Sequence, residues 1–150
     1  MATAPIETPT QLRFTHRFAA SRQRVYRAWT EPELLMKWFV ESEGRVDKCD
    51  IDLRTGGEYR IEGRMGTKPW SIWGKYLEVK PGEKLVYTWQ WDFDPTAGAQ
   101  TGDTRVTVEF RDLGKETEVT LTHEGFESEP AREGHKKGWL GCFDRLEKFV

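Results

Sequence analysis

The chain has 150 residues and a formal net charge of -2, with 23 Lys and Arg residues interspersed among 25 Asp and Glu residues. This length is typical of a single domain with its own core, and without a clustered basic stripe the chain is not expected to bind nucleic acid. The sequence contains neither an apolar run long enough to span a membrane nor a charged-then-apolar leader, so we expect a cytoplasmic protein with no membrane span.

The residues available for a core are rich in rings. Aromatic residues make up 13% of the chain, including seven Trp and eight Phe, whereas hydrophobic residues of all kinds reach only 37%. Rings must therefore supply much of the buried surface. The two cysteines, Cys49 and Cys142, are too few for a disulfide framework and belong to no Cys/His cluster, so we expect reduced thiols, no metal and no other cofactor.

The N-terminal end is predicted to hold a loose segment, one strand and two short helices. Residues 1–10 contain two prolines among small and polar residues, which predicts disorder, and residues 11–150 are expected to form one domain. Apolar residues alternate along residues 11–18, as in a half-buried strand. Ser21 is suited to cap a first helix. The T-x-x-E pattern that begins at Thr30 resembles a capping box, which predicts the start of a second helix.

Strands are predicted to fill the middle of the chain, because a period of two runs from Arg45 to Glu124. Gly56-Gly57 indicates a hairpin corner. Pro81-Gly82 predicts a type II turn, since glycine accepts the positive φ that the second central position requires. Together with the first strand this makes seven strands in meander order, which are therefore antiparallel.

An amphipathic helix is predicted from about Ala131 to Val150, with Trp139, Phe143 and Leu146 on one face. Such a helix is roughly 30 Å long and can lie along the whole sheet. Seven strands make a sheet about 34 Å wide, however, whereas a helix with its side chains covers only about 10 to 12 Å. Either aromatic side chains fill the remaining space or a cavity is left.

Several segments together resemble a known family. Asp52 to Gly57 carry a D-x-R-x-G-G pattern, and the other segments are Trp29–Phe39, Gly74–Val79 and Gly138–Leu146. From about Leu12 onward the chain resembles the family named for its likeness to the activator of the heat-shock protein 90 ATPase, within the START-like (SRPBCC) superfamily. The resemblance implies an α+β helix-grip fold: a curved antiparallel sheet of about seven strands wrapped on a long C-terminal helix, with two short helices after the first strand. Its members commonly keep a cavity between sheet and helix.

Three polar features have both a structural and a functional interpretation. Asp52 and Arg54 lie on one face of their strand, where they either pin the hairpin by pairing with each other or contact a ligand. His16 and His123 are predicted to face inward near strand ends, as hydrogen-bonded core or rim residues or as proton-transfer groups. His135, amid charged neighbours, is expected to be solvated.

The candidate ligand-binding residues are inward-facing and mostly aromatic. Trp38 and Phe39 close the second helix and are expected either to guard the entrance of a cavity or to pack in the core. The loop 92–103 either gates that entrance or is an idle surface loop. Trp139 is expected to be packed against the sheet, with Tyr87 and Trp89 facing the cavity. The predicted cavity wall consists of Tyr59, Ile61, Ile72, Tyr76, Tyr87, Trp89, Val108, Trp139 and Phe143, unless these residues form a core without room for a ligand.

Three functions compete. The first is non-catalytic binding of a small hydrophobic molecule, aromatic or lipid-like, in the helix-grip cavity. The second is a co-chaperone-like interaction module with a weak chaperone contact, as the family name implies. The third is a cyclase- or hydratase-like enzyme, which is less expected because no GxSxG, HExxH, P-loop or paired acid and base is visible, so no catalytic residue is assigned. The chain is expected to be a monomer or a weak dimer.

Overall fold

The computed structural model describes residues 6–8, 10–39, 44–92 and 104–150. It contains one antiparallel sheet in the order β1-β2-β8-β7-β6-β5-β4-β3, and three helices. The helices are α1 (Arg22–Thr30), α2 (Pro32–Trp38) and α3 (Glu129–Phe149). The strands are β1 (Ile6–Thr8), β2 (Gln11–Phe18), β3 (Gly44–Ile51), β4 (Glu58–Met65), β5 (Lys68–Lys80), β6 (Lys84–Asp92), β7 (Thr104–Asp112) and β8 (Thr117–Glu124).

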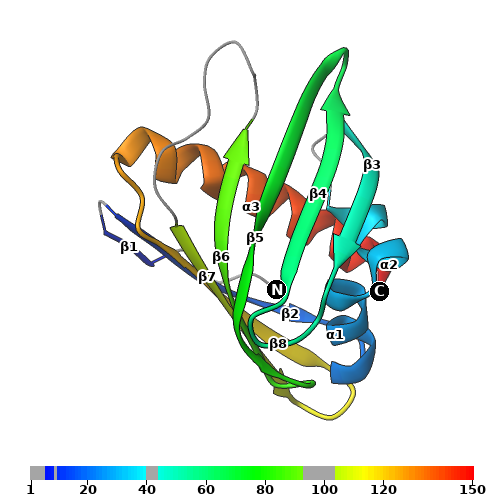
Figure 1. Ribbon diagram of the computed structural model, residues 1–150. Coiled ribbons are helices and arrows are strands. Elements are labelled where there is room, and N and C mark those ends of the chain that lie inside the picture. The colour runs from blue at the N-terminus through cyan, green and yellow to red at the C-terminus, as the bar shows by residue number, and fades with distance from the viewer. Residues whose placement is uncertain (1–5, 9, 40–43, 93–103) are drawn as a thin grey trace.

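The sheet curves around the long helix α3, which runs along its concave face (Figure 1). The short helices α1 and α2 follow β2 and lie at one end of the sheet. This is the α+β helix-grip arrangement that the sequence predicts, and all seven predicted strands are present. The core lies between α3 and the sheet, where Trp139, Phe143 and Leu146 are buried as the helical period indicates.

The sheet has an eighth strand that the sequence does not predict. Residues 6–8, inside the segment expected to be disordered, form β1 and pair with β2 in the register Ile6↔Arg13 to Thr8↔Gln11. Composition is a poor guide here, because an edge strand is held through main-chain hydrogen bonds that any residue except proline can make. Residues 1–5 and residue 9, which belong to the same segment, lie outside the described part of the chain.

Most of the predicted local signals are confirmed, but the capping box is wrong. Ser21 caps α1 through its side chain, and Gly82 has a φ of 76° in a turn closed by the Glu83 N–H donating to the Lys80 carbonyl. Thr30, by contrast, is the last residue of α1, and its hydroxyl donates to the Tyr26 carbonyl. Glu31 becomes the N-cap of α2 instead, without a side-chain hydrogen bond.

In the D-x-R-x-G-G corner, Asp52 and Arg54 pair with each other, as the structural interpretation of this motif predicts. The Arg54 guanidinium donates to the Asp52 carboxylate at 2.9 Å, and both side chains are exposed. Gly56 has a φ of 85° and donates its N–H to the Tyr76 carbonyl, while Gly57 accepts from the Tyr76 N–H. A Cβ on Gly57 would lie 2.1 Å from the Asp52 carbonyl oxygen, so this position needs glycine. The corner therefore clamps the turn onto β5.

Three further properties of the described residues bear on function. Both cysteines are free, as expected. None of the helices in the described part combines the length and apolar character that a membrane crossing requires. Within the same ranges, no three His, Cys, Asp or Glu side chains gather where they could hold a metal ion.

Candidate functional site

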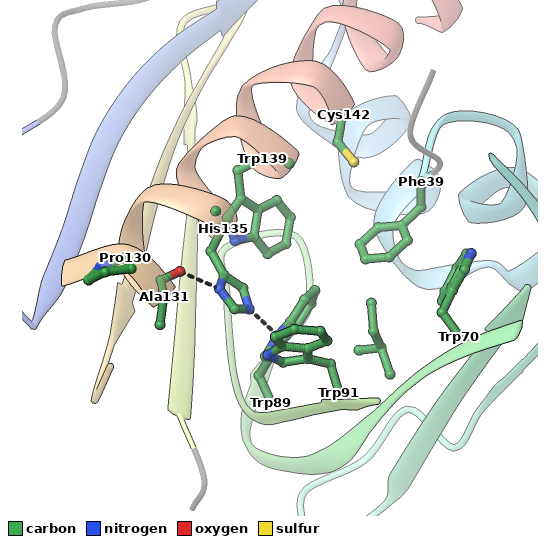
Figure 2. A pocket seen from close by; sticks show the side chains of 12 residues that line it. Phe39, Trp70, Trp89, Trp91, Pro130, Ala131, His135, Trp139 and Cys142 are labelled. Carbon is green, nitrogen blue, oxygen red and sulfur yellow. Dashed lines mark hydrogen bonds between the residues drawn. The ribbon is translucent and has the colours of Figure 1, made fainter. Parts of the chain in front are cut away.

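A pocket of about 550 Å³ opens between α3 and the adjoining parts of β5 and β6 (Figure 2). Such a volume suits a small organic ligand. The pocket is lined mainly by apolar and aromatic residues, with no Lys, Arg, Asp or Glu among the described residues that form it. These residues are Phe39, Trp70, Ile72, Trp89, Trp91, Pro130, Ala131, Gly134, His135, Gly138, Trp139 and Cys142.

The strand side of the pocket follows from the two-residue period of β5 and β6. Trp70 and Ile72 are two residues apart on β5, and Trp89 and Trp91 are two apart on β6. Ile72 pairs directly with Trp91 across the two strands. All four side chains therefore leave the sheet on its concave face.

Beside His135 and Trp139, the helix side of the pocket carries several small residues. Ala131, Gly134, Gly138 and Cys142 recur at helical spacing along α3 and line the cavity. A Cβ on Gly134 would meet no atom within 4 Å, so the space beside it is open. The cavity exists where small helix residues face large strand residues that do not reach them.

Two histidines accept hydrogen bonds from two of the four indoles that line this cavity. The Trp89 Nε1–H donates to His135 Nε2 at 3.2 Å, and His135 Nδ1 bonds the Ala131 carbonyl at 2.8 Å (Figure 2). The Trp139 Nε1–H donates to His123 Nδ1 at 3.0 Å. Because an indole nitrogen can only donate, the accepting imidazole nitrogens must be unprotonated.

The remaining nitrogen of each imidazole is also engaged. His135 Nδ1 carries the proton that it donates to the Ala131 carbonyl. His123 Nε2 lies 2.7 Å from Thr104 Oγ1, whose hydroxyl donates to the Trp89 carbonyl at 2.9 Å. His123 is thus the Nε2-protonated tautomer and His135 the Nδ1-protonated one. Every ring nitrogen of the pair has a partner.

Burial favours the neutral form of both histidines. Desolvation lowers the pKa of His123 well below its ordinary value, and the neighbouring His135 lowers it further. Desolvation likewise lowers the pKa of His135, partly offset by its hydrogen bond to the Ala131 carbonyl. The two rings lie 5.1 Å apart, so a charge on one would oppose a charge on the other.

Residues 19–150 match the model described as Activator of Hsp90 ATPase homolog 1-like protein. The chain belongs to this family. The resemblance inferred from the sequence is therefore confirmed. No curated protein matches the chain.

Solved structures share the fold over almost the whole chain. Protein CV1439 from Chromobacterium violaceum is 28% identical, with a TM-score of 0.79 over 95% of this chain and 98% of that one. Protein NE0264 from Nitrosomonas europaea is 24% identical, with a TM-score of 0.78 over 96% of both chains. Protein Ms6760 from Mycobacterium smegmatis is 16% identical, with a TM-score of 0.84 over 100% of this chain and 97% of that one. The last two likenesses show the fold alone.

In this member of the Activator of Hsp90 ATPase homolog 1-like family, four of the residues proposed from the sequence line the pocket. They are Phe39, Ile72, Trp89 and Trp139. Trp139 is both packed and pocket-lining: only 3% of it is exposed, and its ring lies 5.2 Å from that of Trp89. The expectation that Trp139 packs while Trp89 faces the cavity is therefore too simple, since both indoles do both.

The other proposed residues are buried but do not line this pocket. Trp38 is fully buried and donates its Nε1–H to the Ala28 carbonyl at 2.9 Å, which makes it a core residue rather than an entrance residue. Ile61, Val108 and Phe143 belong to the general core. Tyr87 packs against two other tyrosines and is not among the residues that line this pocket.

These three residues, Tyr59, Tyr76 and Tyr87, form a packed group that we call the tyrosine cluster. Their ring centroids are 5.3 to 5.8 Å apart. The Tyr59 hydroxyl donates to the Thr88 carbonyl at 2.6 Å, and the Trp29 Nε1–H donates to the Tyr87 hydroxyl at 3.4 Å. Burial raises the pKa of all three phenols. Here the rings fill the space between the strands and the helices.

His135 is the main residue that the sequence interpretation misplaces. Its charged neighbours in the sequence predict a solvated residue, yet His135 lies against Trp89, Trp91 and His123. A usable signal was present, because His135 precedes Trp139 by four residues and so shares its helix face. Trp70 and Trp91 were also missed, although each is two residues from a proposed wall residue. His123 is the hydrogen-bonded core residue of the first interpretation. Most of the loop 92–103 lies outside the described residues.

Proposed function

We propose that this protein binds a small, neutral, largely aromatic molecule in the pocket between α3, β5 and β6. The observation that supports this most directly is the pocket itself, about 550 Å³ of space walled by Phe39 and the four tryptophans 70, 89, 91 and 139. Aromatic walls favour flat aromatic ligands, because rings attract one another in offset and edge-to-face arrangements beyond their buried area.

The polar groups of the lining support a neutral ligand. Among the described lining residues the ionisable side chains are His135 and Cys142. Both nitrogens of His135 already have partners, so the imidazole has no hydrogen bond left to offer. A carboxylate or sulfonate entering this pocket would lose its hydration without gaining a cation, which is costly.

The same facts support binding over catalysis. A cyclase- or hydratase-like reaction needs an acid and a base placed at the ligand, with environments that separate their pKa values. His135 and His123 share one environment that lowers both pKa values, and both are held in fixed tautomers by neighbouring groups. This pair is arranged to hold side chains in place.

The co-chaperone-like alternative comes from the family description and has less structural support. Docking onto a partner protein generally uses a contiguous exposed apolar patch. In the described part of the chain, the large hydrophobic residues that are exposed are Leu53 and Leu77, at 38% and 44%. We therefore place ligand binding first and leave the chaperone contact as an outcome of the test.

The test uses a pair of glycines on the same helix. Gly134 lines the pocket beside open space, whereas Gly141 is absent from the lining and faces the flexible end of Arg145. Gly134→Leu and Gly141→Leu both remove a helix glycine and should each raise stability by up to about 1 kcal/mol. Only Gly134→Leu places a side chain in the cavity.

The probe is N-phenyl-1-naphthylamine, a neutral fluorescent arene, with 8-anilino-1-naphthalenesulfonate as its anionic counterpart. We expect the neutral probe to bind the unmodified protein more tightly, and Gly134→Leu to weaken that binding by at least about tenfold while Gly141→Leu leaves it unchanged. Equal binding to both variants would refute the pocket as the site. If neither probe binds and a chaperone ATPase responds to the protein, the interaction-module function replaces this one.

A further inference from the structure

His123 and His135 form an adjacent pair at the pocket, where His135 is part of the lining and His123 packs beside it. Each accepts the N–H of a different indole that lines the cavity, Trp139 in one case and Trp89 in the other. His123 is fully buried. These contacts come from β8, β6 and α3, so the pair ties the helix wall of the pocket to its strand wall.

The hydrogen bonds of Trp89 and Trp139 affect the shape of the pocket because both indoles border it. Trp38 and Trp29 also donate their N–H groups, to the Ala28 carbonyl and the Tyr87 hydroxyl, but rings and backbone surround them closely. Trp89 and Trp139 instead border about 550 Å³ of space. An indole that loses its partner beside a cavity has room to rotate into it. The hydrogen bonds of Trp89 and Trp139 therefore bear on the volume of the pocket that is available to a ligand.

The same bonds depend on the charge of the imidazoles. A neutral imidazole offers one accepting nitrogen, whereas a protonated one carries hydrogen on both and accepts nothing. Protonating His135 would set its Nε2–H against the Trp89 N–H, and protonating His123 would do the same at Trp139. Neither indole could keep its present partner.

We propose that His123 and His135 are positioning residues of the pocket, which in their neutral forms hold Trp139 and Trp89 in the orientation that keeps the cavity open, and which release both indoles in acid. The effect of histidine protonation on ligand binding rests on the proposed function. The positioning itself is a property of the ligand-free protein.

The charged groups around the pair are compatible with this assignment. The contacts of His135 come from Trp89 and Trp91 on β6, His123 on β8 and Phe126 after it, so His123 is the titratable group that faces it from other elements. His123 in turn meets Thr104 of β7, and on α3 it meets His135 and Trp139. The nearby charges of α3 include the ion pairs of Arg132 with Glu129 and Glu133 and of Lys136 with Glu133.

The first experiment needs no ligand. The indole Nε1–H signals of the protein are followed by ¹H–¹⁵N NMR in three forms, the unmodified chain, His135→Gln and His135→Leu. Gln can accept the Trp89 N–H but does not titrate, whereas Leu removes the acceptor. We expect the Trp89 signal to stay near its original position in His135→Gln and to move to a non-hydrogen-bonded position in His135→Leu. The Trp29 and Trp38 signals report that each variant is folded.

The second measurement is the same spectrum of the unmodified protein between about pH 8 and about pH 4, with the imidazole nitrogens observed alongside. The Trp89 and Trp139 signals should move as the imidazoles take up protons, while Trp29 and Trp38 stay in place. Imidazoles that protonate without moving either indole would overturn the proposal. So would a Trp89 signal that is alike in His135→Gln and His135→Leu.

The consequence for binding is measured separately with N-phenyl-1-naphthylamine. Its affinity for the unmodified protein should fall about fivefold to tenfold over the pH range in which the imidazoles protonate, and His135→Gln should flatten that dependence. Probe affinity that ignores this protonation would overturn the regulatory part of the proposal. Absence of probe binding at every pH would refute the proposed function instead, and the indole signals would still decide the positioning role.

Discussion

Strands β5 and β6 carry mostly aromatic residues on their concave face, yet the two ends of this strand pair differ. At one end Tyr76 pairs with Tyr87 and joins Tyr59 in the tyrosine cluster, where the rings meet one another. At the other end Ile72 pairs with Trp91, and the tryptophans border a pocket. The strands supply large side chains in both places, so the opposite surface must decide which end is filled.

The helices make that difference. Above the tyrosine cluster, Trp29 of α1 reaches down and donates to the Tyr87 hydroxyl. Above the tryptophans, α3 presents Ala131, Gly134 and Gly138, which leave the space unfilled. In this chain the cavity therefore reflects a shortage of side-chain volume at these three helix positions, beside His135 and Trp139, rather than a special property of the strands that face them.

The largest expected effect comes from a substitution in the tyrosine cluster, which is the filled end of the strand pair. Tyr87→Ala removes a ring packed on all sides and should lower the free energy of unfolding by about 3 to 5 kcal/mol. Trp91→Ala removes a larger but half-buried ring that already borders open space, so it loses fewer contacts and should cost visibly less. Urea midpoints, with unchanged m-values as the control for two-state unfolding, compare the two variants. Equal losses would mean that the pocket is as tightly packed as the cluster.

The two ends should also respond to opposite extremes of pH. Burial lowers the pKa values of His123 and His135, so the unfolded chain binds more protons than the folded one, and stability is lost as the pH falls below the ordinary histidine value of 6.5. Burial raises the pKa values of the three tyrosines, so their contribution is complete below the ordinary value of 10.0 and is lost as the pH rises above it. Each unit of difference in pKa is worth about 1.4 kcal/mol.

Thermal midpoints measured from acid to alkaline pH check this assignment. The loss of stability at low pH is the acid limb of this profile, and the loss at high pH is the alkaline limb. His135→Gln should flatten part of the acid limb and leave the alkaline limb alone. His16, whose pKa is also lowered by burial, lies against Phe143 and Glu147 away from the pocket, so His16→Gln separates its share of the acid limb. An acid limb that survives in a variant lacking all three histidines would show that carboxylates cause it.

The fold was more predictable from the sequence than the site, for physical reasons visible in single residues. Periodicity, turn glycines and the Ser21 cap are local signals, and they located every helix and strand except β1. Membership of the concave face is also local, which is why Ile72 and Trp89 were found. Whether a residue on that face touches a ligand depends on what stands opposite, and nothing near Tyr87 in the sequence says that Trp29 covers it. The small residues of α3 indicate where a cavity can form, but only once it is known which strand residues lie opposite them.

The smallest expected effect sharpens the comparison through two glycines, Gly74 at the boundary between the two ends and Gly134 at the pocket. Gly74 of β5 lies between the tyrosines and the pocket, where a Cβ would stand 2.0 Å from the Thr88 carbonyl oxygen. That oxygen also accepts from the Tyr59 hydroxyl, so it is held in place. Gly74→Ala should therefore force the backbone apart and cost about 1 to 3 kcal/mol.

Gly134→Ala should have the opposite sign, because its Cβ meets open space and alanine is favoured over glycine in a helix by about 1 kcal/mol. Gly141→Ala serves as the matched helix control. Chemical denaturation of the three variants gives the signs, and NMR signals of Tyr59 and Trp89 show which end has moved. A Gly134→Ala variant less stable than Gly141→Ala would mean that α3 is already in close contact with the strands at that point, and the distinction between a filled end and an open end would then fail.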